Sequence, residues 1–278
     1  YTLTARGKDE LNLSPLPDSF SIKIKRGEDG KITGFTSVQP QGNVEFVKAD
    51  ASKIAMTVDE LYAKALAASG GEANWKKLHS RETAAIVDLE QQGVKATAKS
   101  WAKEPNKTAT ETKMTALGKE IATGWEFFDG TTGEEAYSFA PIEKYTGKRL
   151  EDIKLASDFH SMLDWKAKYK NIAITRIAKV GDEEAYAVEF EPEKGTKFTE
   201  YYSTKSFLLL KREGVPSSTS SVSIPYSVRF EDYREIDGVK LPFKQINSSA
   251  GNGDIVTIVT SVKHNVPIDD KIFVPRKP

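Results

Sequence analysis

SIPYSVRFEDYREIDGVKLPFKQINSSAGNGDIVTIVTSVKHN, residues 223–265, is the stretch that decides the fold. Apolar and polar residues alternate on both sides of Asp237-Gly238, as expected of strands with one buried face. Asp-Gly between such runs predicts a tight hairpin because both turn positions need a positive φ. A second turn at 250–253 leads into 255–260, IVTIVT, which is apolar on both faces and therefore predicts a strand covered on both sides. The stretch predicts consecutive antiparallel strands.

Two residues mark irregular places in this predicted sheet. Pro242 has no backbone N–H to donate, so its strand must have an edge or a bulge at that point. Tyr233 is out of phase with Phe230, and one extra residue near Glu231–Asp232 would restore the alternation. We therefore expect a β-bulge there.

Similar strand patterns run over residues 82–140 and 172–213, and a helix pair precedes them. Thr57 and Glu60 fit a capping box, in which each side chain accepts the other residue's backbone N–H. Apolar residues then recur every three or four positions until Gly70-Gly71, which can supply the left-handed backbone after a helix. The pattern predicts one helix over 57–69 and a shorter one over 72–78.

A second helical region, from Leu150 to Tyr169 with a break near Ser157–Asp158, separates the two sets of strands. A sheet of about eleven twisted strands has to curl or split. The apolar stripes of the helices are available to cover its concave side. We therefore predict a mainly β fold: an incomplete antiparallel β-barrel, or half-barrel, covered by helices and enclosing an apolar cavity.

Residues 1–48 differ in pattern from the rest of the chain. Short alternating runs separated by glycine-containing turns predict a β-meander of about four strands, and a unit of this size buries little surface alone. With a linker over 49–55, we predict two domains: a small β-meander domain, 1–50, and a half-barrel domain, 56–278. Because Tyr1 lies inside a predicted strand, we expect the meander to be the tail of a longer protein.

Composition excludes several classes of function. Lys+Arg 40 and Asp+Glu 40 balance, so no net positive field attracts nucleic acid, and we expect no nucleic-acid partner. No run of about 18 apolar residues occurs, which predicts no transmembrane segment. The chain has no Cys, which excludes disulfides, thiolate nucleophiles and zinc–thiolate sites.

Residues able to carry catalytic chemistry are scattered. His79, His160 and His264 lie far apart in the sequence, and neither H-E-x-x-H nor G-x-S-x-G occurs. The acidic residues of 189–193 alternate along one face of a predicted strand, as solvated side chains do. We predict no catalytic residue, no metal site and no cofactor, and therefore no enzyme.

Aromatic and aliphatic side chains remain as candidates for a site. Most of them should be ordinary core, and periodicity does not separate core from cavity lining because a helix stripe over a concave sheet produces both. Our candidates for the lining of the hydrophobic cavity are Trp101, Trp125, Phe128, Phe159, Leu163, Phe190 and Tyr202.

Several segments of residues 56–275 resemble the LolA-like proteins, the outer-membrane lipoprotein-sorting group of bacteria. Asp232–Phe243 and His264–Asp270 are the most specific matches. The other matching segments are Thr57–Gly71, Trp75–Leu78, Gly124–Gly133 and Val180–Tyr186. Residues 1–48, with Gly30–Phe35, are similar to a small β-domain that trails beta-lactamase-like serine hydrolases.

The resemblance implies an incomplete antiparallel barrel closed by helices, with lipid or acyl chains held in its apolar interior. It also implies a periplasmic or cell-envelope location in a bacterium. The lipoprotein carrier of the family has a buried arginine, for which Arg176, Arg212 and Arg229 are the candidates here.

Pattern and resemblance together support two functions. The first is a non-catalytic envelope protein that binds a hydrophobic small molecule, a lipid or a lipoprotein acyl chain between the curved sheet and its helical lid. The alternative is an accessory structural module of a larger cell-envelope hydrolase, which would precede Tyr1 in the same chain and leave this part without a ligand. An enzyme in its own right would need a cavity that brings His160, an acid and a hydroxyl together.

Overall fold

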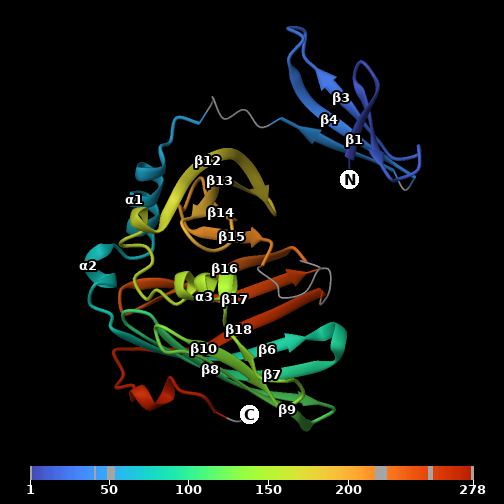
Figure 1. Ribbon diagram of the computed structural model, residues 1–278. Coiled ribbons are helices and arrows are strands. Elements are labelled where there is room, and N and C mark those ends of the chain that lie inside the picture. The colour runs from blue at the N-terminus through green and yellow to red at the C-terminus, as the bar shows by residue number, and fades with distance from the viewer. Residues whose placement is uncertain (1, 41, 49–53, 217–223, 250–252, 277–278) are drawn as a thin grey trace. The chain divides into compact units, whose positions relative to one another are not determined.

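The computed structural model describes residues 2–40, 42–48, 54–216, 224–249 and 253–276 (Figure 1). The chain divides into two compact units, Tyr1–Lys53 and Ile54–Pro278. This division falls in the predicted linker 49–55, of which residues 49–53 lie outside the described residues. Most of the predicted turn at 250–253 also lies outside them.

The N-terminal unit is an antiparallel meander in which the described residues form five strands in chain order. The strands are β1 (Thr2–Gly7), β2 (Glu10–Ser14), β3 (Ser21–Arg26), β4 (Ile32–Gln39) and β5 (Gly42–Val47). About four strands were expected, and the fifth arises because residues 2–14 form a hairpin of their own. Phe35 stacks on Phe46 with ring centroids 4.5 Å apart.

The second unit is built on one large antiparallel sheet, for which the described residues supply thirteen strands. The first set is β6 (Ser80–Leu89), β7 (Val94–Lys103), β8 (Lys107–Ala116), β9 (Lys119–Phe128), β10 (Gly133–Tyr137) and β11 (Glu143–Lys144). The second set is β12 (Tyr169–Val180), β13 (Glu183–Pro192), β14 (Phe198–Ser203), β15 (Leu209–Gly214), β16 (Tyr226–Ile236), β17 (Val239–Ser249) and β18 (Gly253–His264).

The two sets join where the last strand, β18, pairs with the first, β6. The sheet order therefore runs from β11 through β6 and β18 to β12, and β11 and β12 are its terminal strands. The sheet curves strongly without closing (Figure 1). The predicted mainly β, incomplete barrel with a small meander is confirmed.

The hairpin between β16 and β17 forms as predicted. Asp237 and Gly238 have φ values of 52° and 80°, the pair of positive values that a two-residue hairpin requires. Pro242 pairs with Tyr233 on one side, while the pairing of β17 with β18 begins only at Lys244. Pro242 therefore occupies a local edge, where its missing N–H costs no ladder hydrogen bond.

The predicted bulge near Glu231–Asp232 is wrong. Glu231 pairs with Lys244 and Tyr233 with Pro242, so the register contains no inserted residue. Asp232 instead has a φ of 55°, a left-handed conformation that Asp tolerates better than most residues. This local change in backbone conformation coincides with Phe230 and Tyr233 both lining the same cavity.

Helix α1 (Val58–Ala68) begins at the predicted capping box: Glu60 N donates to Thr57 Oγ1 at 3.2 Å, and Thr57 N donates to Glu60 Oε2 at 2.9 Å. The short helix α2 (Glu72–Trp75) follows directly. The C-terminal end of α1 rests on the β16–β17 turn, where Lys240 N donates to the Ser69 carbonyl at 2.9 Å. These contacts fix the helix pair against the edge of β17 that β18 leaves unpaired.

The second helical region breaks near Ser157–Asp158 as predicted, but the part beyond the break is not an α-helix. Helix α3 spans Gly147–Ala156, and the chain then turns rather than continuing as a helix to Tyr169, where β12 begins. The helix ends because the Asp158 carboxylate accepts the backbone N–H of His160 at 3.0 Å, a local bond that competes with helix formation. In the described part of the chain, the short helical turns outside α1–α3 are η2 (Glu90–Gln92), η3 (Lys166–Lys168) and η4 (Asp270–Ile272).

Helix α3 connects the two halves of the open sheet. At its N-terminal end, the guanidinium of Arg149 pairs with Glu143 on β11 and with Glu135 on β10, the latter at 2.6 Å. One turn later, the Asp152 carboxylate accepts the backbone N–H and the hydroxyl of Thr196, between β13 and β14, at 2.7 and 2.8 Å. Figure 1 shows α3 in the hollow of the curved sheet.

The face of β7–β9 opposite to α3 is covered by the segment that follows β18. Ile268 and Phe273 of this segment pack in one buried cluster with Trp125 and Phe127. The Trp125 indole donates to the Val274 carbonyl at 2.9 Å. This part of the sheet is therefore covered on both faces.

Candidate ligand-binding site

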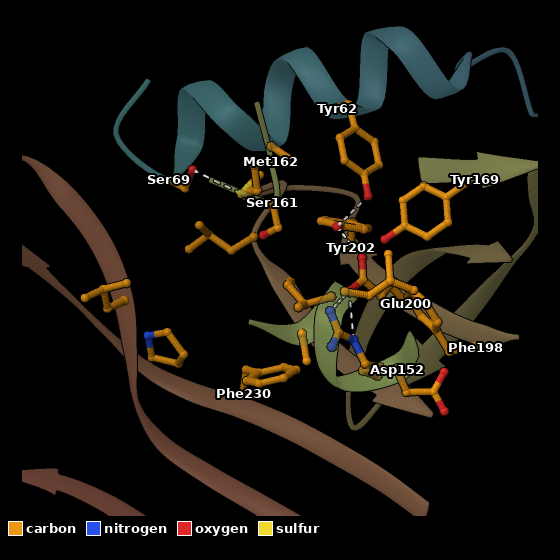
Figure 2. A pocket seen from close by; sticks show the side chains of 18 of the residues that line it. Tyr62, Ser69, Asp152, Ser161, Met162, Tyr169, Phe198, Glu200, Tyr202 and Phe230 are labelled. Atoms are coloured by element: carbon orange, nitrogen blue, oxygen red, sulfur yellow. Dashed lines mark hydrogen bonds and ion pairs between the residues drawn. The ribbon is translucent and has the colours of Figure 1, made fainter. Parts of the chain in front are cut away.

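A cavity of about 510 Å³ lies between the sheet, α1 and α3 (Figure 2). Its apolar and aromatic lining comes from both helices, from the turn after α3 and from five strands. Among these residues are Tyr62, Ala65, Ile153, Leu155, Ala156, Met162, Tyr169, Phe198, Tyr202, Leu209, Phe230, Tyr233, Leu241 and Pro242. The predicted hollow beneath the helices is therefore present.

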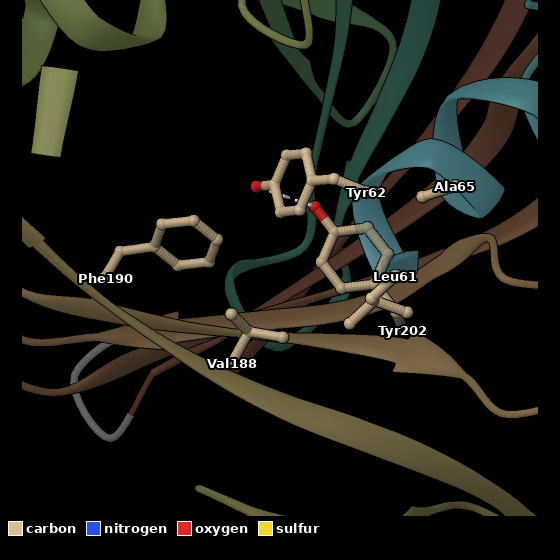
Figure 3. Packing of buried hydrophobic residues seen from close by; sticks show 6 residues of the cluster. All are labelled: Leu61, Tyr62, Ala65, Val188, Phe190 and Tyr202. Carbon is tan, nitrogen blue, oxygen red and sulfur yellow. Dashed lines mark hydrogen bonds between the residues drawn. The ribbon is translucent and has the colours of Figure 1, made fainter. Parts of the chain in front are cut away.

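The wall under α1 is a packed aromatic cluster. Leu61, Tyr62 and Ala65 of α1 are buried against Val188, Phe190 and Tyr202 of the sheet (Figure 3). Phe190 stacks on Phe198 with centroids 4.8 Å apart. Helix α1 is thus held by side-chain packing, and Tyr62, Ala65 and Tyr202 of this cluster also line the cavity.

Charged side chains also line the cavity: Arg149, Asp152, Lys197, Lys240 and the pair Arg212–Glu200. The carboxylate of this pair is buried. The Nε and Nη2 of Arg212 on β15 both donate to Oε1 of Glu200 on β14, the former at 2.9 Å. The Tyr202 hydroxyl donates to the other carboxylate oxygen at 2.5 Å. The Glu200 side chain is 5% exposed, whereas Arg212 keeps 38% of its side-chain surface accessible. In Figure 2, Tyr62 points from α1 toward this group.

Burial and the carboxylate act together on these side chains. Burial disfavours a charged guanidinium, but the charge and hydrogen bonds of Glu200 outweigh it and raise the pKa of Arg212. Burial, followed by the negative charge of Glu200, raises the pKa of both Tyr202 and Tyr62 well above the usual value. Both tyrosines therefore stay neutral and act as hydrogen-bonding groups.

Replacing Arg212 by methionine is expected to lower the free energy of unfolding by about 2 kcal/mol, because it leaves the buried Glu200 carboxylate without its cation. The loss is smaller than for a fully buried pair because Arg212 is partly accessible. Urea denaturation measures it. The matched variant Arg229→Met removes an exposed pair with Glu231 and should cost less than about 0.5 kcal/mol; equal losses would contradict the assignment.

A second cavity, of about 200 Å³, lies beneath the turn that follows α3. Arg81 of β6 lines it together with Phe159, and the guanidinium carbon of Arg81 lies 5.9 Å from the centre of the Phe159 ring. His264 of β18 is the cross-strand neighbour of Arg81. Its Nδ1 lies 2.9 Å from an oxygen of Asp237, whereas its buried Nε2 has no hydrogen-bond partner among the described residues.

His264 makes stability depend on pH. Burial lowers its pKa, and the nearby positive charge of Arg81 lowers it further, while Asp237 opposes both effects. The folded protein therefore binds this proton less readily than the unfolded chain does, and stability falls as pH drops through the unfolded histidine pKa of about 6.5. Between about pH 7.5 and pH 5, a His264→Gln variant should lose less unfolding free energy than the parent. Parallel losses would show that His264 does not contribute.

The predicted lining residues lie in three places. Tyr202 is in the wall of the large cavity, and Phe190 is in the cluster beneath α1. Phe159 and Leu163 line the second cavity, while Phe128 is completely buried. Trp101 and Trp125 lie on the opposite face of the sheet, under the segment that follows β18. A ligand-binding role for these residues stays a prediction.

The three candidate arginines lie in different parts of the structure. Arg212 lines the large cavity, while Arg176 contacts the Tyr201 hydroxyl at 2.7 Å and Arg229 pairs with Glu231. Sequence reasoning missed Glu200. Its only signal is a carboxylate in the strand sequence FTEYYS, where most neighbours have aromatic rings.

The described residues contain no cluster of three or more His, Cys, Asp or Glu side chains arranged to hold a metal ion. His160, Asp158 and two serines do line the second cavity. However, the Nε2 of His160 faces the carbonyls of Trp75 and Leu78 at 3.2 and 2.9 Å, and Asp158 pairs with Lys168. In the part of the chain that the structure describes, no helix has the length and apolar character needed to cross a membrane.

Comparison with known proteins places the fold. No protein-family model and no curated protein matches the chain. A LolA superfamily protein from Nitrosomonas europaea is similar at 16% identity and a TM-score of 0.51, over 80% of this chain and 99% of that one. A DUF1329 family protein from Desulfovibrio piger is similar at 12% identity and a TM-score of 0.52, over 78% of this chain and 97% of that one. The chain therefore has the LolA-like fold.

Proposed function

We propose that this protein binds a hydrophobic ligand, a lipid or an acyl chain, in the large cavity and acts without catalysis. The observation that carries the proposal is the cavity itself, whose volume of about 510 Å³ lies within the roughly 300–1,000 Å³ of small-molecule sites. Apolar side chains supply most of its wall. Each buried CH₂ of a ligand contributes about 0.8 kcal/mol, so a long chain can bind there without any covalent chemistry.

The LolA-like fold supports a setting in the periplasm or cell envelope of a bacterium, which we propose for this chain. A lipoprotein acyl chain and a free lipid are both compatible with the lining. Most charged side chains of the lining are paired within the protein: Arg212 with Glu200, Arg149 with Glu135, and Lys197 with Glu191. Paired charges together with a mostly apolar lining favour a ligand that is apolar along most of its length.

Titration with N-phenyl-1-naphthylamine, a neutral apolar fluorophore, tests the proposal on the delipidated full chain. Saturable binding at about one molecule per chain, and its displacement by dodecanol, are expected. Native mass spectrometry of the protein from a bacterial host should show a lipid-sized adduct before delipidation. Absence of both saturable uptake and adduct would contradict ligand binding.

The alternative function, an accessory module without a ligand, draws on the N-terminal unit. Leu3, Val44 and Phe46 of this small unit are about half exposed, and large apolar side chains at a surface can mark a contact with another domain. A hydrolase domain in the same chain is part of this alternative. It would be favoured if the fluorophore were not taken up while the fold stayed intact.

A further inference from the structure

Arg81 is a guanidinium without a partner. Among the described residues its side chain makes neither an ion pair nor a hydrogen bond, and its close neighbour is the ring of Phe159. Burial alone lowers its pKa, which agrees with the absence of a neighbouring carboxylate. Arginine does not escape this situation by losing its proton, so an unpaired, mostly buried guanidinium is costly for the fold.

Other arginines of the second unit contrast with Arg81. Those that face a carboxylate within 4 Å are Arg149, Arg176, Arg212, Arg229 and Arg234. Because the chain pairs these guanidinium groups, the missing partner of Arg81 calls for a separate explanation.

The cavity beside Arg81 has the polar groups of an anion site. Ser157, Ser161 and Thr108 are among its lining residues, and Thr108 Oγ1 lies 3.1 Å from Ser157 Oγ. Asp158 is the carboxylate of this lining, and it is neutralised by Lys168. The cavity therefore contains one uncompensated positive charge surrounded by hydrogen-bonding groups, which is the environment that a carboxylate or phosphate requires.

The two cavities adjoin. Trp75, Ala156, Ser161 and Met162 line both of them, so the partition is formed by shared side chains. Met162 is an unbranched residue that adapts readily to a neighbouring ligand. An amphiphile can thus place its chain in the large cavity and its head group beyond this partition.

We infer that Arg81 and the cavity beside it form an anion-binding subsite, which takes the carboxylate or phosphate head group of the amphiphile whose chain occupies the large cavity. This inference rests on the proposed function. It makes the ligand an acidic lipid rather than a neutral one. Arg81 supplies the charge, and the hydroxyls of the turn after α3 supply further hydrogen bonds.

Displacement of N-phenyl-1-naphthylamine from the full chain by dodecyl phosphate and by dodecanol tests the inference, with both kept below the micelle concentration of the phosphate. The two competitors share one chain and differ in the head group. Dodecyl phosphate should displace the fluorophore from the parent protein at a concentration about tenfold lower than dodecanol requires. The reason is that charge-assisted hydrogen bonds are worth about 1.4 kcal/mol or more. Laurate against methyl laurate repeats the comparison for a carboxylate.

Arg81→Met should reduce the phosphate preference to about twofold or less, while Arg81→Lys keeps part of it because the charge remains. Arg229→Met, which removes an arginine outside both cavities, should keep the full preference. Thermal unfolding separates ligand binding from a structural role: without ligand, Arg81→Met should leave the Tm unchanged or raised, since it removes an unpaired charge. A lowered Tm would assign Arg81 to the fold instead.

Equal displacement by dodecyl phosphate and dodecanol in the parent protein would overturn the subsite while leaving the proposed function standing. Failure of the fluorophore to bind at all would overturn the proposed function, and the subsite with it. Inorganic phosphate distinguishes the source of the anion. If it raises the Tm of the parent but not of Arg81→Met, and dodecyl phosphate has no advantage, the head-group assignment is wrong and the site binds a free ion.

Discussion

Replacing Ile153 by aspartate is expected to weaken uptake of N-phenyl-1-naphthylamine by about tenfold or more. Ile153 lies on α3 and lines the large cavity. A carboxylate there has to lose water when an apolar ligand fills the cavity, and burying a polar group without a partner costs about 1–3 kcal/mol. Each 1.4 kcal/mol is about a tenfold change in affinity. Fluorescence titration of the parent and variant measures the ratio.

Leu150→Asp is the matched control, because it makes the same kind of change on the same helix. Leu150 is partly buried but does not line the large cavity. Its variant should bind the fluorophore within about twofold of the parent. If both variants lost affinity equally, the effect would come from disturbing α3 rather than from the cavity wall, and the assignment of Ile153 would fail.

Replacing Gly70 by alanine is expected to lower the free energy of unfolding by about 3 kcal/mol. Gly70 has a φ of +121°, and an added Cβ would lie 2.2 Å from the Gly238 carbonyl oxygen and 2.8 Å from Val239 Cα. Both obstacles are backbone atoms of the β16–β17 turn, so a side-chain rotation cannot relieve the clash. For a unit of this size the change corresponds to a Tm lower by about 6–12 °C.

Gly71→Ala separates the clash from backbone strain. Gly71 also has a positive φ, +82°, but a Cβ added there would have no other atom within 4 Å. It should therefore cost only the strain of its backbone conformation, φ 82° and ψ 156°, which few residues other than glycine adopt. This strain is about 1–2 kcal/mol. Equal losses for the two variants in thermal unfolding would show that the contact between α1 and the hairpin contributes nothing.

The parts of the fold that were predictable are those specified by neighbouring residues. The hairpin at Asp237-Gly238 and the cap at Thr57 depend on residues within four positions of each other, and both form. The end of α3 lies at the predicted break near Ser157–Asp158. The segment beyond the break was mispredicted as helical because apolar residues continue at helical spacing there, at Phe159 and Leu163. There the local hydrogen bond of Asp158 prevailed over periodicity.

The residues that line the cavity were less predictable, because a side chain lines it only if the helices and not another segment cover its face of the strand. Trp101 and Trp125 alternate as cavity residues would, but the segment after β18 covers their face. That segment has no regular period to reveal its docking. The pairing of Arg212 with Glu200 depends on the register of β14 against β15, and Arg81 is distinguished by the partner it lacks. Neither relation is visible in a list of residue types.

The bridge formed by α3 determines how wide the interior is. In a closed barrel, the number of strands and the stagger of their hydrogen-bond register determine the barrel diameter. Here Arg149 and Asp152 of α3 connect β10 and β11 on one side with the β13–β14 connection on the other. Replacing Arg149 or Asp152 by a residue with a longer or shorter side chain changes the width of the interior, while every strand keeps its register. Cavity size can therefore evolve through single substitutions on a ten-residue helix.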